Sequence, residues 1–294
     1  MILTGCSGWS YSDWVDRFYP RELAQRHSEW LRYYARYFPT TEVNSTFYSM
    51  PAREMVESWV AKTEDVKGFE FSIKLPGSIT HEKLPAGDMD GIASDFDAFR
   101  RNCITPLSSA GRLGAVLVQL PPQFGFSNDS IRTLASMMEE VADDRADYAL
   151  EFRHRSWLER GEIRREAAQL LSAMNFTAVL VDSPAFPTTS RITAQHAYLR
   201  FHGRNRDIWY GGAGGDDMRI NRYDYIYSRG QLEEWIPTVR EISGLTDVTR
   251  IYFNNHGRAK AAKNALEMME LLGIRHAEKH IRIMDQARLG SFSD

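Results

Sequence analysis

The sequence predicts a (β/α)8 barrel of the TIM type, a closed parallel sheet inside a ring of helices, in one domain over residues 1–294. Eight short stretches of apolar and β-branched residues alternate with segments of helical periodicity. Polar residues collect at the C-terminal end of these stretches, where barrels of this type carry their functional groups. No linker, repeat or low-complexity tract divides the chain. A doubly wound open sheet is the alternative fold.

Each expected strand is a short apolar or alternating run that stops at polar, glycine or proline residues. The run before Pro121 and Pro122 is apolar throughout, which is typical of a strand buried on both faces of a parallel sheet. In chain order the expected strands are 2–8, 41–44, 69–76, 115–120, 148–153, 177–182, 197–202 and 250–255.

The segments between the strands predict helices. The first begins after Pro20, and its apolar residues from Leu23 to Phe38 keep helical spacing. An Asn or Asp cap is expected near Asn128. A loop as long as 203–223 is more often functional than accidental. The expected helices are 21–38, one from Pro51 through Val60, 94–103, 128–141, 161–174, 228–242 and 259–272, with a helical tail over about 274–294.

The composition limits which binding partners and which cellular compartment are expected. A net charge of −3 gives no general attraction for nucleic acid, so nucleic acid is not an expected partner. Two cysteines are too few for a disulfide framework and fit a reducing cytosol. The stretch around Cys6 resembles a lipoprotein cleavage box but lacks the basic and apolar regions before it. We therefore expect a cytoplasmic protein with no membrane partner; the sequence does not indicate an oligomeric state.

Glu42 and Asn44 are two residues apart at the end of the second strand, so they face the same side. Residues two apart on each of the other strands likewise face one side, so the same alternation places a set of polar side chains at the mouth of the barrel. A set of this kind can also be a group of ion pairs that only closes the mouth. The expected set is Ser7, Glu42, Asn44, Ser72, Lys74, Gln119, Glu151, Arg153, Asp182, Arg200, His202 and Asn254.

The residue types in this set suggest roles. Acid–base chemistry is assigned to the carboxylates and the imidazole, namely Glu42, Glu151, Asp182 and His202, of which a carboxylate pair of the glycosidase kind is one version. Lysine and arginine would hold a carboxylate or phosphate. The expected substrate-binding residues are Ser7, Trp9, Asn44, Lys74, His81, Gln119, Arg153, Arg200, Trp209 and Asn254.

A divalent metal is the rival use of the same residues. Glu151, Asp182 and His202 end three successive strands, and carboxylates with one imidazole suit such an ion. The interleaved Arg153 and Arg200 argue against a cation there. No phosphate-binding, dinucleotide-binding or zinc-protease motif appears, so no cofactor is assigned beyond a possible divalent metal.

Several motifs together resemble the YecE-like family, a TIM-barrel domain of unknown function. Cys6 stands where threonine is as readily expected, which weakens the case for a cysteine nucleophile. The resemblance implies a TIM barrel and no established activity. It is carried by 5–11 (GCSGWSY), 42–48 (EVNSTFY), Lys74 with Thr80 and His81, 118–122 (VQLPP), 151–153 (EFR) with Ser156 and Trp157, 198–203 (YLRFHG), and 253–256 (FNNH) with Ala262 and Asn264.

The leading hypothesis is an enzyme with hydrolase-like acid–base chemistry, acting on a small anionic or sugar-like metabolite at the mouth. A non-catalytic ligand-binding or regulatory protein is the first alternative, and it would leave a bound ligand unchanged. A metal-dependent or nucleic-acid-related activity is the other alternative. The basic and aromatic surface that nucleic acid would need is modest and local, formed by Arg204, Arg206, Trp209 and Arg219. If Glu151 is the acid or base, Glu151→Gln keeps the fold and abolishes turnover.

Overall fold

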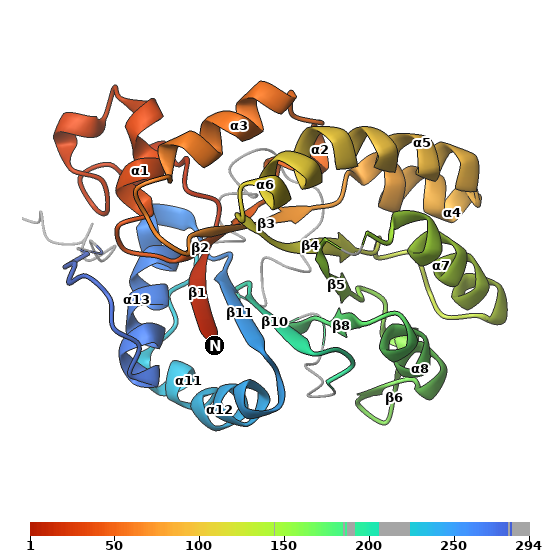
Figure 1. Cartoon of the computed structure of the whole chain (residues 1–294). Coiled ribbons are helices and arrows are strands. Elements are labelled where there is room, and N and C mark those ends of the chain that lie inside the picture. Colours follow the sequence, from red (N-terminus) through yellow and green to blue (C-terminus); the bar gives the residue numbers. More distant parts are fainter. Residues whose placement is uncertain (144, 185, 187–191, 206–223, 282, 284–294) are drawn as a thin grey trace, which may run out of the picture.

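The computed structural model describes residues 1–143, 145–184, 186, 192–205, 224–281 and 283. Parallel strands form a ring with helices outside it (Figure 1). The neighbour order is β8-β5-β4-β3-β2-β1-β11-β10-β9. The strands are β1 Ile2–Ser7, β2 Thr40–Val43, β3 Glu70–Lys74, β4 Leu113–Gln119, β5 Asp147–Glu151, β8 Phe176–Ala178, β9 Leu180–Asp182, β10 His196–Phe201 and β11 Val248–Phe253.

Among the described residues the sheet has nine strands where eight were expected, because the expected sixth strand is divided. Only Val179 separates β8 from β9, and its amide still donates to the Leu150 carbonyl at 3.0 Å. β8 pairs with β5, and β9 pairs with β10. The two edges of the sheet are therefore consecutive parts of one extended segment, and the expected barrel is confirmed.

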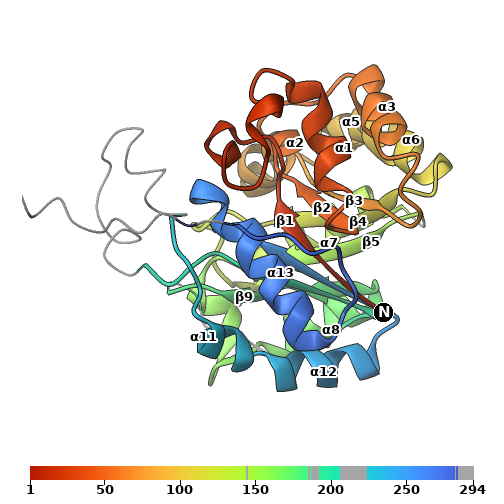
Figure 2. The same cartoon turned by 90° about the vertical axis from the view of Figure 1, so that its left-hand side faces the viewer.

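The helices cover the outside of this barrel. In Figure 2, α1, α3 and α6 lie on one side of it, and α11, α12 and α13 lie on the other. No described helix has the length and apolar character needed to cross a membrane. The α-helices are α1 Trp30–Tyr34, α2 Ser45–Tyr48, α3 Arg53–Lys62, α4 Leu84–Ala86, α5 Met89–Phe99, α6 Thr105–Ser109, α7 Asn128–Val141, α8 Arg165–Ala173, α11 Arg229–Glu233, α12 Ile236–Leu245 and α13 Lys260–Leu272.

Shorter helical and extended pieces lie between these elements. Two π-helical segments, η4 Ser78–Lys83 and η5 Arg100–Ile104, adjoin α4 and α5. The 3-10 turns are η1 Ser12–Trp14, η2 Arg21–Leu23, η3 His27–Glu29, η6 Arg155–Trp157 and η7 Gly257–Ala259. An antiparallel hairpin, β6 Leu158–Glu159 with β7 Glu162–Ile163, lies outside the barrel sheet.

The first expected helix is mostly wrong. Residues 21–29 form 3-10 turns, and only Trp30–Tyr34 is α-helical. The Trp30 indole donates to the Leu23 carbonyl at 2.8 Å and stacks on Tyr19 at 5.0 Å, so tertiary contacts of one tryptophan hold the segment in turns. Aromatic packing here outweighs helical spacing.

Other helix boundaries differ for local reasons. The helix expected at 161 begins at Arg165, because the β6–β7 hairpin turns through Arg160 and Gly161 at φ 53° and 85°. The cap of α7 is Ser127 instead of Asn or Asp; its hydroxyl accepts from the Ser130 amide at 3.0 Å. The helical tail is wrong where the structure describes it, since residues 274–281 and 283 carry no helix.

The interior of the barrel is built in layers. At the N-terminal ends of the strands, Arg250 binds Glu70 at 2.6 Å and Asp147 at 2.8 Å. In the middle layer, the Tyr252 hydroxyl lies 2.6 Å from Thr40 Oγ1 and donates to Ser72 Oγ at 2.8 Å. Apolar residues form a buried cluster with Tyr252 in the interior, namely Ala115, Leu117, Ala149, Val179 and Val181. These two layers close the barrel below the mouth.

Candidate functional site

Strand register brings the polar side chains of the mouth together. Glu42 pairs with Ser7 on one side and with Ser72 on the other, so all three face the interior. Gln119 pairs with Glu151 in the same way. The expected convergence of carboxylates from β2 and β5 on one interior layer is therefore present in the structure.

Arg200 is the centre of the mouth. Its Nη2 donates to Glu42 Oε1 at 2.8 Å, and its Nη1 donates to Glu151 Oε2 and, at 3.3 Å, to Gln119 Oε1. Both carboxylates are fully buried and Arg200 is 2% exposed. Charges this deep are tolerated only when they are paired and hydrogen-bonded. One guanidinium thus links three strands through its two terminal nitrogens.

The rest of the Glu42 carboxylate is also occupied. Ser7 Oγ donates to Oε1 at 2.7 Å and the Tyr198 hydroxyl donates to Oε2 at 2.6 Å. Burial, followed by the Glu42 charge, holds the pKa of Tyr198 well above its usual value, so the phenol remains a donor. Sequence reasoning missed Tyr198, although it precedes Arg200 by two residues and shares its face.

Glu151 has two arginine partners. Besides Arg200, it accepts from Arg153 Nη1 at 2.7 Å. Burial alone would raise the pKa of Glu151, but the charges of Arg200 and Arg153 outweigh it and hold the pKa well below the usual value. The carboxylate is ionised at neutral pH, so Glu151 is not suited to act as a general acid.

His202 and Asn254 form a buried pair. Asn254 Nδ2 lies 2.9 Å from His202 Nδ1. An amide nitrogen can only donate, so Nδ1 accepts and the imidazole proton lies on Nε2, which is 3.9 Å from Glu151 Oε1. Burial, followed by the charge of Arg200, keeps the pKa of His202 well below its usual value. The neutral imidazole therefore presents a donor toward Glu151.

Lys74 differs from the other cations of the mouth. It is 6% exposed, and its Nζ lies 3.8 Å from the centre of the Phe47 ring. Among the described residues no carboxylate lies within 4.0 Å of this nitrogen, whereas Arg200 binds both Glu42 and Glu151, and Arg153 binds Glu151. Burial, followed by the charge of Arg200, lowers the pKa of Lys74 to about 7. Lys74 can therefore gain or lose a proton at neutral pH.

Two further expected residues lie at the rim. Asn44 precedes α2, and its Oδ1 is buried without a hydrogen-bond partner among the described residues. His81 lies in η4, with Nδ1 2.8 Å from Thr80 Oγ1 and its ring edge-to-face with Phe47 at 4.9 Å. Burial, followed by the charges of Lys74 and Arg153, lowers the pKa of His81 to about 4.

Asp182 does not line the mouth, so that expectation is wrong. Its register partner is Phe201, whereas Arg200 pairs with Val181, so Asp182 faces the outer helices. There it accepts from Tyr227 at 2.9 Å, Trp235 at 2.9 Å and Arg204 at 2.7 Å. These contacts tie β9 to the surrounding segments. Asp182 is a structural acceptor in this geometry.

Three other expectations change with the structure. Trp9 packs on Trp59 and Phe71 at 5.8 and 6.2 Å, outside the barrel wall and away from the mouth. Ser72 lies one layer below the mouth, where it accepts from Tyr252. Trp209 lies outside the described residues.

The expected metal ligands do not converge. Glu151 and His202 face the interior, but Asp182 points away from them. Across the part of the chain that the structure describes, no three His, Cys, Asp or Glu residues are grouped so that they could hold a metal ion. The sequence-based metal set is therefore not assembled.

Most of the chain matches known proteins of one kind. Residues 3–287 match the model of the family described as "Protein of unknown function DUF72". The UPF0759 protein YunF of Bacillus subtilis is 30% identical over 291 residues, covering 97% of this chain and 99% of that protein. The UPF0759 protein YecE of Escherichia coli K12 is 26% identical over 258 residues, covering 81% of this chain and 83% of that protein.

Solved structures agree with this match. A DUF72 family protein from Thermotoga maritima superposes with a TM-score of 0.79 at 33% identity, covering 93% of this chain and 99% of that one. A DUF72 family protein from Enterococcus faecalis superposes with a TM-score of 0.77 at 26% identity, covering 97% and 100%. The similarity therefore extends over both sequence and fold.

Proposed function

The chain belongs to the DUF72 family, whose function is unknown. From the geometry of the mouth we propose that it is an enzyme that transfers protons on a small anionic or sugar-like metabolite. The observation that supports this most is the state of Lys74. It is a buried lysine beside two arginines, without a carboxylate partner among the described residues. Its pKa near neutrality is what an acid–base catalyst requires.

The charges of the mouth favour an anionic substrate. Among the described residues of the mouth, two carboxylates, Glu42 and Glu151, balance Arg200 and Arg153, which leaves the positive charge of Lys74 in excess. The terminal nitrogens of Arg200 are already taken by the carboxylates. Arg153, whose side chain is 21% exposed, and Lys74 are therefore the groups that would bind the anion.

Asn44 supplies the complementary polar contact. Its buried Oδ1 has no donor among the described residues, and a buried acceptor in that state is costly. A substrate hydroxyl or amide group would satisfy it. The mouth thus offers cations for an anion and one acceptor for a hydroxyl, which fits the sugar-like part of the proposal.

The proposed proton transfer assigns new roles within the expected residue set. In a hydrolytic reaction, the Lys74 ammonium that binds the anion gives its proton to the leaving group as the bond to that group breaks. The neutral amine then takes a proton from water as the water oxygen bonds to the substrate, so the protons balance. Glu42 and Glu151 hold Arg200 in place, and the Nε2–H of His202 is a fixed donor.

A ligand-binding protein without turnover is the second candidate. It is favoured by the saturation of the Glu42–Arg200–Glu151 network, because every carboxylate oxygen there already accepts a hydrogen bond. Such a network holds its shape without needing to exchange protons. The two candidates differ only in whether Lys74 performs chemistry on the bound ligand.

Isotope transfer tests the proposal for proton transfer at carbon and for hydrolysis alike. Sugar phosphates and uronic acids are incubated with the protein in water labelled with deuterium and heavy oxygen, and mass spectrometry detects label in the compounds. Proton transfer at carbon introduces deuterium, and hydrolysis introduces heavy oxygen. Lys74→Met is compared with Lys67→Met, the same change at an exposed position before β3.

We expect label above the protein-free level with the wild-type protein and with Lys67→Met, and only the protein-free level with Lys74→Met. Label that survives in Lys74→Met would remove Lys74 from the mechanism. If a compound stays bound in native mass spectra but never acquires label, the protein is a binding protein instead.

A further inference from the structure

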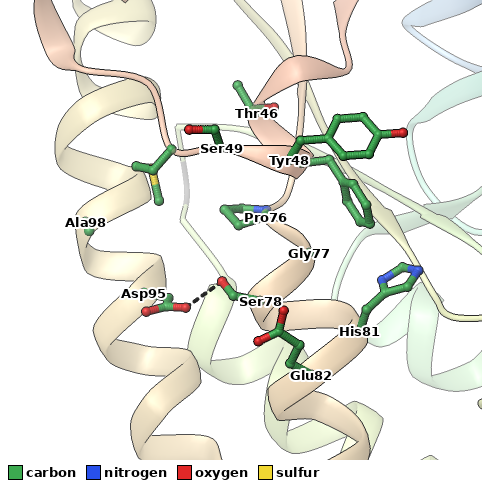
Figure 3. Close-up of a pocket in the computed structure, with 12 residues that line it drawn as sticks. Thr46, Tyr48, Ser49, Pro76, Gly77, Ser78, His81, Glu82, Asp95 and Ala98 are labelled. Atoms are coloured by element: carbon green, nitrogen blue, oxygen red, sulfur yellow. Dashed lines mark hydrogen bonds between the residues drawn. The ribbon is translucent and has the colours of Figure 1, made fainter.

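A cavity adjoins the mouth and is not used by the mechanism above. It has a volume of about 580 Å³ and lies between α2, η4 and α5 (Figure 3). This volume is in the range of small-molecule pockets. The residues that matter for its chemistry are Phe47, Tyr48, Ser78, His81, Glu82 and Asp95.

The cavity and the mouth share a wall. The Phe47 ring that lies 3.8 Å from Lys74 Nζ also lines the cavity, and His81 packs edge-to-face on the same ring. Gly77 allows this arrangement, because a Cβ there would come within 3.1 Å of the Phe47 ring. A ligand whose anionic end is bound at Lys74 can therefore extend past one aromatic ring into the cavity.

The lining suits an uncharged, hydroxylated ring. Tyr48 is 83% exposed, so one phenol ring stands in solvent at the edge of the cavity. Figure 3 shows Tyr48 on one side, with His81 and Glu82 across from it. Aromatic rings contact the apolar faces of sugar rings, and polar side chains bind the hydroxyls at their edges.

Two carboxylates set the charge preference of the cavity. Asp95 accepts from Ser78 Oγ at 2.6 Å and pairs with Lys83. The exposed carboxylate of Glu82 has no hydrogen bond or ion pair with any described residue, so it can accept from ligand hydroxyls. A second anionic group would be repelled here. The cavity thus complements the mouth, which attracts an anion.

We propose that this cavity is a second subsite that receives the neutral hydroxylated ring of the substrate, whose anionic group binds in the mouth. This inference rests on the proposed function and narrows it: the substrate class is a sugar that carries one anionic group, either a phosphate or a carboxylate. Phosphate and carboxylate share the charge that Arg153 and Lys74 bind. Tyr48 and Glu82 would contact the sugar ring.

Binding measurements separate the two subsites. Calorimetry compares glucose 6-phosphate, ribose 5-phosphate and glucuronate with inorganic phosphate, acetate and glucose. We expect at least one anionic sugar to bind about tenfold more tightly than the matching bare anion. Tightest binding of a sugar phosphate or of the uronate identifies the anionic group.

Variants then test the ring contacts. Tyr48→Ala should lower the affinity for the anionic sugar by about tenfold. The affinity for inorganic phosphate should not change, because phosphate does not reach the cavity. Glu82→Gln should also lower the affinity for the anionic sugar, by a smaller factor. Met55→Ala, at another exposed apolar residue on α3, is the matched control and should change neither affinity.

The outcomes distinguish the two proposals. The second subsite would be overturned if Tyr48→Ala and the wild-type protein bind the anionic sugar with equal affinity. It would also be overturned if no anionic sugar binds more tightly than the matching bare anion. Either result would leave the anion site intact. If neither bare anions nor anionic sugars bind the wild-type protein, both the anion site and the subsite are refuted.

Discussion

The Nζ of Lys74 lies 3.8 Å from the centre of the Phe47 ring. This contact gives the ammonium an aromatic face where a carboxylate would be the usual buried partner. It also joins the charged mouth to the cavity that Phe47 lines. The chemistry of the site and the recognition of a substrate ring therefore meet at one pair of residues.

Anion binding should depend on pH through Lys74. With a pKa of about 7, the lysine is charged below that pH and neutral above it. Sulfate keeps its charge in this range, so we expect its affinity to fall by at least about tenfold between roughly pH 6 and pH 9. Calorimetry measures the effect, and Lys74→Met should bind sulfate weakly at every pH. A flat profile in the wild-type protein would show that Lys74 does not titrate there.

Lys74 should also lower the stability of the fold at neutral pH. Its pKa falls from 10.5 to about 7 on folding, so between these values the unfolded chain binds more protons and stability rises with pH. Lys74→Met removes this cost, and we expect a gain of about 1–3 kcal/mol at pH 7 that shrinks toward pH 10.

Urea unfolding at several pH values measures this difference. Lys67→Met is the control, because its exposed side chain should leave the stability unchanged. A variant Lys74→Met that is less stable than the wild-type protein at neutral pH would contradict the account.

Glu151→Gln should destabilise the protein, which differs from the sequence-based expectation that it keeps the fold intact. The change leaves Arg200 and Arg153 without their shared anion in a buried layer. Breaking such a pair costs about 3–5 kcal/mol. The control is Glu57→Gln in the exposed Arg53–Glu57 pair, which should cost less than about 1 kcal/mol. Equal unfolding midpoints for the two variants would refute the central role of Glu151.

The contribution of Glu151 should vanish in acid. Its pKa is depressed in the folded protein, so the stabilisation is complete above the unfolded value of 4.5 and is lost as the pH falls toward the folded value. Wild type and Glu151→Gln should therefore converge in stability as the solution is acidified. A constant difference down to strongly acidic pH would be inconsistent with this pairing.

Asp182→Asn should affect stability and not the ligand. The change weakens the ion pair with Arg204 and costs about 1.5–3 kcal/mol, the range for hydrogen bonds to charged groups. Sulfate affinity should stay within about twofold of the wild-type value, because Asp182 faces the outer helices. If Asp182→Asn lost sulfate affinity and kept its stability, Asp182 would have to line the mouth.

Much of the barrel could be predicted because its strands and strand ends are local patterns. Alternation along the sequence was sufficient to place Glu42 and Glu151, which lie at or near the C-terminal ends of their strands, on the interior face. It failed for Asp182, because the run before it is apolar on both faces and shows no alternation. Only the pairing of Val181 with Arg200 fixes the face of that strand.

The roles within the mouth depend on long-range geometry. Lys74 resembles an anion-binding residue in the sequence, and its depressed pKa arises from burial and from Arg200 on a distant strand. The cavity beside Phe47 requires the π-helical turn of η4 after β3, which no local pattern indicated. The sequence therefore predicts which residues gather, and the structure is needed to tell which of them can exchange a proton.

Competitive labelling of lysines tests the central claim most directly. The rate at which acetic anhydride modifies Lys74, measured by peptide mass spectrometry against Lys67 over a range of pH, reports the titration of its amine. We predict a midpoint near 7 for Lys74 and an ordinary one for Lys67. A Lys74 midpoint near the usual 10.5 would contradict the proposed acid–base role.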